Sequence, residues 1–497
     1  MKTLAWLGLL LASQFIALPQ ITQSVVPATL YRDDQILVLP RPGTDNALAE
    51  LRRAWQSEVR STFPSLGGLQ VVSVPPPETV ASLIEKFQQS GWVQYAEPDY
   101  RRFLNVVPDD PKFTDGALWG LHNTGQNGGT ADADIDAPEA WDLIHDASNV
   151  IVAVLDTGIR YTHEDLAANL WTHPLDGGHG FNAFDGSTNV LETSGSGHGT
   201  MVAGVVGAVG NNGKGTTGVA WRVQLMAGKC FDAVGNSSDS LIIACLDYAR
   251  TNGAQIILGA FDSPAYSQSL SNAIVAVRDA GIIFVSSCGN AEPPAYQPVN
   301  VDVNPRYPAG YDIDNIVSVA YTDRNDQLGV LSNYGATNVD LAAPGENIYT
   351  THVATDTFYT DFYSGTSLAA PHVAGALALM KARFPTEPPQ QLIQRLLSAV
   401  DPKPALQGKC ATGGRLNLYR ALSPPLRLTP LAAPGDWPFR LRVSTGPNRW
   451  CVVETSTDLV QWQPVHTNTT SATGTFDYTA ATPTNAASYF FRATAAP

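Results

Sequence analysis

The sequence predicts an α/β fold with a mainly parallel sheet, preceded by a small α+β unit and followed by a small β-sandwich. In residues 106–422, short apolar runs alternate with segments of helical periodicity, which implies crossover connections and a sheet covered on both faces. Residues 27–105 and 439–497 have different patterns, and 497 residues of which 44% are hydrophobic can form more than one domain.

The N-terminus has the pattern of a secretory signal peptide. A single Lys precedes an apolar run over residues 4–18, which is short for a bilayer because a spanning helix needs roughly 20 residues. We therefore predict a cleaved signal over residues 1–24 and a secreted or extracellular protein. No later segment is apolar enough to span a membrane, and the net charge of −15 argues against nucleic acid as a partner.

Residues 27–105 form the predicted α+β unit. Strands are indicated by β-branched residues and helices by amphipathic spacing. The expected strands are LYRDDQILVLP, LQVVSV and VQYAEPDY, and the expected helices are ALAELRRAWQSEV and ETVASLIEKFQQSG.

In the central part, four apolar runs rich in β-branched residues read as buried strands, with helices between them. The strands are NVIVAVLDTG, RVQLMAGKC, AQIILGAF and GIIFVSSCGN, and the helices include HGTMVAGVVGAV, DSLIIACLDYARTNG and QSLSNAIVAVRDAG. Functional residues of such sheets collect at the carboxyl ends of the strands.

The last part of the chain begins with a Pro-rich stretch, residues 423–438, which we interpret as a linker. Five alternating segments follow within residues 439–497 and predict a small antiparallel β-sandwich without a catalytic constellation. Attachment to a cell surface, glycan or polymer and a stabilising or export role are both open for it.

Three motifs in the central part carry the chemistry. They are LDTG with Asp156, GSGHGTMVAG with His198 and SGTSLAAPHVAG with Ser367. Each alone is typical of a cap or a turn. Together they supply a nucleophile, the base that takes its proton and the acid that orients that base.

The order of DTG, HGT and GTSLAAP resembles the subtilisin (subtilase) family of serine peptidases. The resemblance implies a subtilisin-like three-layer catalytic domain and a serine endopeptidase that works through an acyl-enzyme intermediate. It also implies that Asn290, in SSCGNAEPP, stabilises the oxyanion together with the Ser367 amide. An α/β-hydrolase would carry GxSxG, and the sedolisin group has Glu where His198 stands.

The same resemblance implies that residues 27–105 are an inhibitory, folding-assisting propeptide, which makes the protein an autoprocessed zymogen. Its own propeptide and protein or peptide substrates are then its partners, and we expect a monomer. Cleavage is expected between Arg102 and Pro108. The alternative from another class is a catalytically inactive binding or surface protein on the same scaffold.

A structural calcium site is the implied cofactor site, and no catalytic cofactor is expected. The segments DDPKF, THEDLAAN and GNNGKGTTGVA resemble the family's strong calcium site, and calcium favours six to eight oxygen ligands. The implied ligands are the side chains of Asp110, Asp165 and Asn212 and the carbonyls of Gly210, Lys214 and Thr216. A capped helix beside a flexible loop remains the alternative.

Two further segments resemble the substrate cleft of the family. In CFDAVGNSSDS, the backbone of Gly235, Asn236 and Ser237 is expected to pair with extended substrate. In IILGAFDSPAYSQ, Ala260, Phe261, Asp262 and Ser263 stand where the family usually has a Ser-Leu-Gly-Gly stretch beside the primary specificity pocket. Two interpretations of Asp262 are open, an exposed or turn-capping carboxylate and a preference for Lys or Arg at the cleaved position.

Overall fold

The computed structural model describes residues 31–497 except for a set of short segments. The residues outside the description are 1–30, 77, 101–105, 194, 295, 425, 432–438, 446–449, 458–460, 472–474, 481–489 and 496–497. The predicted signal peptide and most of the expected maturation segment therefore lie outside the described residues. Residues 1–102 and 103–497 form two compact units.

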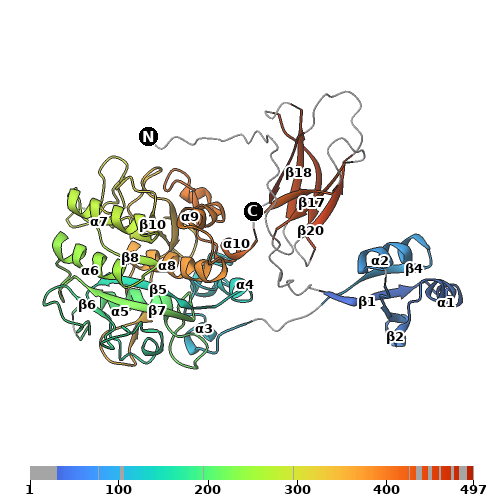
Figure 1. The fold of residues 1–497 in the computed structure, drawn as a ribbon, viewed down its shortest axis with the longest axis horizontal. Helices are drawn as coiled ribbons and strands as arrows, with labels where there is room; N and C mark the ends of the chain where they lie inside the picture. Colours follow the sequence, from blue (N-terminus) through green and yellow to red (C-terminus); the bar gives the residue numbers. More distant parts are fainter. Residues whose placement is uncertain are drawn as a thin grey trace. The chain divides into compact units, whose positions relative to one another are not determined.

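The N-terminal unit is an antiparallel sheet of order β2-β3-β1-β4 with two helices (Figure 1). Its core is formed by apolar residues of both layers, among them Ile36, Leu83 and Phe87. The elements are β1 (Tyr31–Pro40), α1 (Asp45–Ala54), β2 (Val59–Phe63), β3 (Leu69–Ser73), α2 (Val80–Gln89) and β4 (Val93–Tyr100). The first helix was predicted too long, because Gln56 takes φ +57° and ends it before the predicted end.

The second unit contains a nine-stranded sheet of order β14-β15-β11-β10-β9-β8-β5-β7-β6. All neighbouring strands are parallel except the edge pair β14 and β15. The strands are β5 (Asp146–Asp156), β6 (Gly180–Asn182), β7 (Arg222–Lys229), β8 (Ile256–Gly259), β9 (Ile283–Ser287), β10 (Ile316–Thr322), β11 (Leu341–Pro344), β14 (Asp401–Pro402) and β15 (Gly414–Arg415). The predicted mainly parallel sheet is confirmed.

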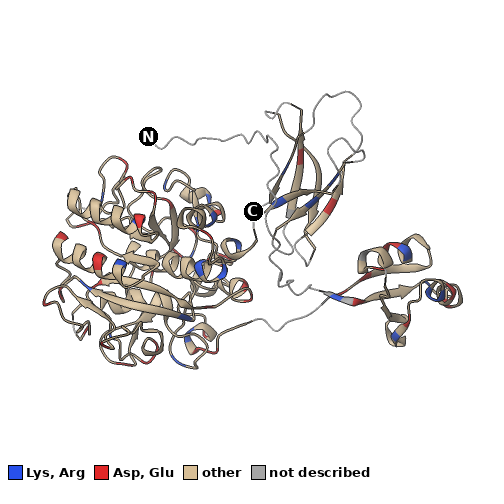
Figure 2. Ribbon diagram, in the orientation of Figure 1, with Lys and Arg blue, Asp and Glu red and all other residues tan. Residues whose placement is uncertain are grey.

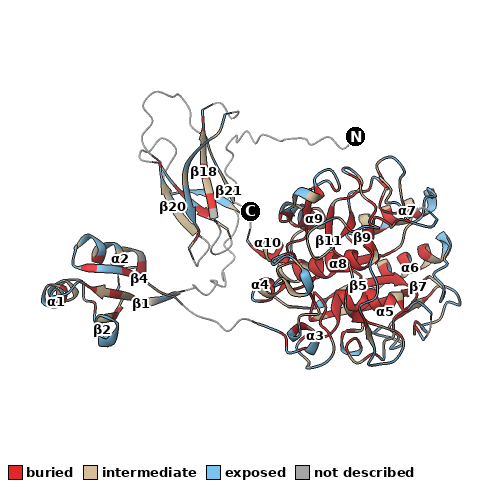
Figure 3. Ribbon diagram, turned by 180° about the vertical axis from the view of Figure 1, so that it is seen from behind, coloured by how far each residue is buried: buried red, intermediate tan, exposed pale blue. Residues whose placement is uncertain are grey.

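Helices cover both faces of this sheet and complete three layers (Figures 1 and 3). Alternate residues of β5 point to opposite faces: Val152 and Val154 pack in one core with α5 and α8, and Ala153 and Leu155 in another with α6 and α7. The helices are α3 (Pro111–Thr114), α4 (Ala137–Trp141), α5 (His198–Gly207), α6 (Asp239–Thr251), α7 (Gln268–Asp279), α8 (Thr366–Arg383), α9 (Pro389–Ser398) and α10 (Leu418–Leu422). A short hairpin, β12 (Thr350–Thr351) with β13 (Tyr359–Thr360), lies beyond the sheet.

The C-terminal strands form two small sheets of orders β16-β17-β20 and β19-β18-β21. Val443 of the first sheet and Val453 of the second belong to one apolar cluster, so the sheets pack face to face. The strands are β16 (Arg427–Pro430), β17 (Arg440–Ser444), β18 (Trp450–Ser456), β19 (Gln463–Thr469), β20 (Thr475–Thr479) and β21 (Phe490–Ala495). The linker prediction for residues 423–438 is wrong at β16, since its pairing with β17 outweighs the Pro-rich composition.

No helix among the described residues is long and apolar enough to cross a membrane. In the full sequence, Asp and Glu outnumber Lys and Arg by 45 to 30. Figure 2 shows acidic and basic residues interspersed over the part of the second unit that contains the nine-stranded sheet.

Candidate active site

The candidate site lies at the carboxyl edge of the central sheet, where three neighbouring strands end. Asp156 is the last residue of β5, Ala260 directly follows β8, and Asn290 lies three residues beyond β9. Because β5, β8 and β9 are adjacent and parallel, these residues come to the same edge. The chain passes from β5 to β6 and β7 on one side and then to β8 on the other, and such a reversal opens a crevice for a ligand.

Asp156 and His198 form a close pair. Nδ1 of His198 lies 2.8 and 2.9 Å from the two carboxylate oxygens of Asp156, one of which also accepts the Thr157 N–H at 2.8 Å. Asp156 is 4% exposed, so its charge is poorly screened. His198 begins α5 directly after Gly197, whose φ of +68° favours glycine.

The pKa of His198 is raised above its ordinary value. Burial is the largest single effect and lowers it, but the charge of Asp156, the hydrogen bond to Asp156 and the charge of Glu192 together outweigh burial. The two carboxylates therefore make this imidazole a stronger base than an isolated one.

Glu192 is a buried carboxylate near the Asp156–His198 pair, and it was not predicted from the sequence. Its carboxylate accepts hydrogen bonds from the Thr157 hydroxyl and from both the N–H and the hydroxyl of Thr200. The Thr157 hydroxyl oxygen also accepts the Gly199 N–H at 3.0 Å. Glu192 is thereby connected to the residue after Asp156 and to the residue after His198. Burial raises the pKa of Glu192. An acid in LETSGSG is not distinguished from a surface residue by the sequence alone.

Ser367 and Asn290 meet at the start of α8. A Cβ atom on Gly365 would lie 3.4 Å from both terminal atoms of the Asn290 amide and 3.5 Å from Ser367 Oγ, so one small space adjoins all three. The Thr366 N–H donates to Asn290 Oδ1 at 3.0 Å. This bond orients the amide and leaves its Nδ2 as a donor for another acceptor.

Helices α5 and α8 pack against each other, and His198 and Ser367 lie at their N-terminal ends. Met201 of α5 and Leu368 of α8 are buried in one apolar cluster. Farther along, a Cβ on Gly375 would lie only 3.0 Å from the carbonyl oxygen of Val206, so the helices nearly touch. None of the hydrogen bonds among the described residues joins Ser367 to His198, which fits a site without substrate, where such bonds are often long.

A pocket of about 250 Å³ opens beside His198. Its lining residues are Asp156, Thr157, Ser196, His198, Phe231, Val234, Gly235, Ala260 and Phe261. The predicted cleft residues Gly235, Ala260 and Phe261 thus line the same pocket as Asp156 and His198. The N–H and C=O of Asn236 are instead bonded to Asp232, and the Ser237 hydroxyl donates to the Cys230 carbonyl.

Asp262 is neither exposed nor a turn cap, so that interpretation is wrong. Its side chain is 16% exposed, and Oδ2 lies 3.4 Å from Nη1 of Arg306. Burial raises the pKa of Asp262 to about 6, against the attraction of Arg306. Because Arg306 already compensates the carboxylate, the basis for a Lys or Arg preference is also weakened.

The predicted calcium ligands Asp165 and Asn212 lie together and are hydrogen-bonded within the protein. Asp165 accepts hydrogen bonds from Asn212 Nδ2 at 2.8 Å, the Thr216 N–H at 3.0 Å and the Tyr359 hydroxyl at 2.8 Å. Asn212 Oδ1, the oxygen expected to bind calcium, accepts the Lys214 N–H at 2.9 Å.

Two more of the predicted ligands, Asp110 and Gly210, also have hydrogen-bond partners within the protein. Asp110 accepts the N–H groups of Asn211 and Asn212, and the Gly210 carbonyl accepts from Arg222 at 3.5 Å. No group of three or more His, Cys, Asp or Glu side chains in the described residues is placed to hold a metal.

Replacing Tyr359 by Phe is expected to destabilise the protein. Loss of the donor to buried Asp165 should cost about 1–3 kcal/mol of unfolding free energy. Chemical denaturation of the inactive Ser367→Ala protein measures this without autolysis, and Tyr349→Phe is the matched control because Tyr349 stacks on Tyr359. An unfolding free energy equal to that of the Tyr349→Phe control would contradict this role of Tyr359.

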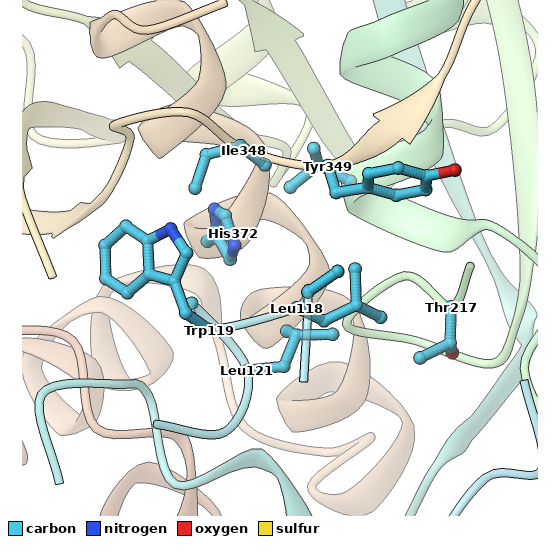
Figure 4. A pocket seen from close by; sticks show the side chains of 10 residues that line it. Leu118, Trp119, Leu121, Thr217, Ile348, Tyr349 and His372 are labelled. Carbon is cyan, nitrogen blue, oxygen red and sulfur yellow. The ribbon is translucent and has the colours of Figure 1, made fainter. Parts of the chain in front are cut away.

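His372, in the first half of α8, has a structural role. It is 2% exposed, its ring Nδ1 bonds the Leu368 carbonyl at 2.9 Å, and burial lowers its pKa to about 4. Figure 4 shows it facing a cavity of about 20 Å³ among Trp119, Leu118 and Ile348, which has room for about one water molecule.

Two family models match the chain. Residues 147–418 match the subtilase family, described as Peptidase_S8, and residues 18–99 match the fervidolysin N-terminal prodomain. The first range holds Asp156, His198, Asn290 and Ser367, and the second covers most of the N-terminal unit.

Individual proteases are also similar to this chain. Thermitase of Thermoactinomyces vulgaris is 33% identical over 58% of this chain and 93% of its own length. Subtilisin DY of Bacillus licheniformis is 35% identical over 50% of this chain and 83% of its own. Among solved structures, a protease of Pseudoalteromonas arctica PAMC 21717 covers 64% of this chain and 99% of its own, with 27% identity and a TM-score of 0.53.

Proposed function

The chain belongs to the subtilase family and is a serine endopeptidase of the subtilisin type, and we propose that Asp156, His198 and Ser367 are its catalytic triad. The observation that carries this is the bonded Asp156–His198 pair at the sheet edge where Ser367 and Asn290 also meet. A fluorophosphonate probe, which reacts with activated serines, should label the enzyme stoichiometrically at Ser367. Labelling elsewhere, or none after maturation, would refute the assignment.

Each residue has a defined part in the reaction. His198 Nε2 takes the proton of Ser367 Oγ as that oxygen attacks the scissile carbonyl carbon, and then gives it to the leaving amine. Asp156, bonded to Nδ1, fixes the tautomer and stabilises the imidazolium. An acyl-enzyme remains, and water attacks it with His198 again acting as the base.

Asn290 is proposed as a donor to the oxyanion. Its Oδ1 is held by the Thr366 N–H, so Nδ2 is the end of the amide that can face the substrate. The Ser367 N–H lies in the first turn of α8, where N–H groups lack helical partners, and supplies the second donor. Two fixed donors act on the oxyanion without any reorganisation during the step.

Substrate is proposed to bind in extended form along the cleft. Gly235 lines the pocket beside His198 and has φ +88°, which leaves its backbone accessible without a side chain. Recognition through backbone groups accepts many sequences. Broad endopeptidase activity is therefore expected, limited by the pocket for the residue at the cleaved bond.

The protein is made as a zymogen with an N-terminal propeptide, which the prodomain match supports. We further propose that the enzyme removes this propeptide itself, between residues 102 and 108, after export directed by residues 1–24. The propeptide unit has its own apolar core, so it can fold as a separate inhibitor. A mature protein with its N-terminus inside this range is the expected product.

Activity should be lost on acidification through the pKa of His198. A protonated imidazole cannot accept the Ser367 proton, and the raised pKa places the midpoint above the ordinary value near 6.5. The pH dependence of kcat/KM measures this, with circular dichroism as the control for unfolding. Glu192→Gln should move the midpoint to lower pH because it removes a charge that favours the imidazolium. An unchanged midpoint would show that Glu192 does not act on His198.

A further inference from the structure

The side chains of Asp262 and Arg306 lie next to the proposed reaction centre. A Cβ on Gly289 would lie 2.6 Å from Asp262 Oδ2, so this carboxylate fills the space beside the residue that precedes Asn290. The carboxylate therefore occupies the slot between the segment after β8 and the segment after β9.

The slot is held in place from both sides. Ser263 and Tyr307 exchange two backbone hydrogen bonds of 2.8 Å, which sets Arg306 opposite Asp262. Arg306 lies 3.4 Å from Asp262 and forms a double contact with Glu292 at 3.2 and 3.3 Å. The side chains of Asp262 and Arg306 are only 16% and 11% exposed, so the pair forms a fixed boundary of this slot.

Strand geometry says which substrate residue reaches this slot. In an extended peptide, neighbouring side chains point to opposite faces. With the scissile carbonyl between Ser367 and Asn290, the pocket lined by His198 and Phe261 receives the side chain one residue before the cleaved position. The side chain at the cleaved position itself then points the other way, toward Asp262 and Gly289.

We infer that the Asp262–Arg306 pair is the floor of the pocket for the residue at the cleaved position and restricts it to small uncharged side chains such as Ala or Ser. A large side chain meets the Asp262 carboxylate in the slot. An acidic side chain meets the charge of Asp262, and a basic one meets Arg306. This inference rests on the proposed function, because it requires the reaction at Ser367.

The test uses the mature enzyme at pH 8, where Asp262 is ionised, and peptides that differ only at the cleaved position, which is Ala, Phe, Lys or Glu. For the unchanged enzyme, kcat/KM should be highest for Ala and about tenfold or more lower for each of the others. Asp262→Gly should raise kcat/KM for Phe about tenfold or more, while Asp262→Asn, the matched control of equal size, should leave Phe poor.

Asp262→Gly could fail to fold because Arg306 then retains only Glu292, so Asp262→Gly/Arg306→Ala provides a second variant without an unpaired buried charge. It should accept Phe as well. Equal cleavage after Phe and Ala by the unchanged enzyme would overturn the inference, as would preference for Lys or Glu, or failure of both Gly variants to gain Phe. Fluorophosphonate labelling separates the causes: a labelled enzyme without the Ala preference refutes the inference alone, and an unlabelled one refutes the proposed function.

Discussion

Replacement of Ser367 by Ala is expected to lower kcat about 10⁶-fold, the scale established for removal of this nucleophile from a triad. Without Ser367 Oγ no acyl-enzyme forms, and the His198–Asp156 pair has no proton to accept. The same variant should accumulate as a precursor that retains its propeptide, if processing is the enzyme's own reaction. Turnover of a peptide substrate and intact mass of the product measure the two effects.

Ser364→Ala is the matched control for this experiment. Ser364 lies three residues earlier, is exposed, and accepts the Asn347 N–H through its hydroxyl. It should process normally and keep most of its activity. Normal maturation or casein hydrolysis by the Ser367→Ala protein would refute the mechanism.

Asn290→Ala is expected to reduce kcat about 100- to 1,000-fold with little change in KM, because a donor made only to the oxyanion acts only in the transition state. Steady-state kinetics on one peptide measures this split. Asn290 also accepts the Thr366 N–H and hydroxyl, so a structural contribution must be separated.

Two further variants make that separation. Asn290→Asp keeps an acceptor for the Thr366 N–H but has no donor for the oxyanion, and should be at least as impaired as Asn290→Ala. Thr366→Val keeps the backbone N–H and loses only the hydroxyl contact of 3.3 Å, so its kcat should change little. Nearly full activity of Asn290→Asp would remove Asn290 from the oxyanion site.

The sequence allowed the chemical centre to be predicted better than its surroundings. Asp156, His198 and Ser367 lie in short motifs whose residue types and order are specific, and the structure brings Asp156 to His198 and Asn290 to Ser367. Glu192 is hydrogen-bonded to Thr157 and Thr200, and nothing in its local sequence reveals those partners.

Long-range partners account for the other misses. Asp262 could be interpreted only as a lone carboxylate because Arg306, on a later loop, compensates it. The predicted calcium set lacked Tyr359, whose hydroxyl reaches Asp165 from the β13 hairpin. In the stretch first interpreted as a linker, β16 forms because β17 supplies its hydrogen-bond partners. For Asp262 and Asp165 the deciding contact is made by a residue distant in sequence, and for β16 it is made by the next strand.

The near contact of α5 and α8 at Gly375 has a consequence for how the enzyme tolerates change. A Cβ there would lie 2.7 Å from the Val219 side chain and 3.0 Å from the Val206 carbonyl oxygen, so even Ala would push the helices apart. Those helices carry the proposed base, His198, and the proposed nucleophile, Ser367, at their N-terminal ends. In a random library, variants at Gly375 would therefore have slow turnover even where folding and yield are preserved. A screen for activity would remove them, and a screen for expression alone would retain them.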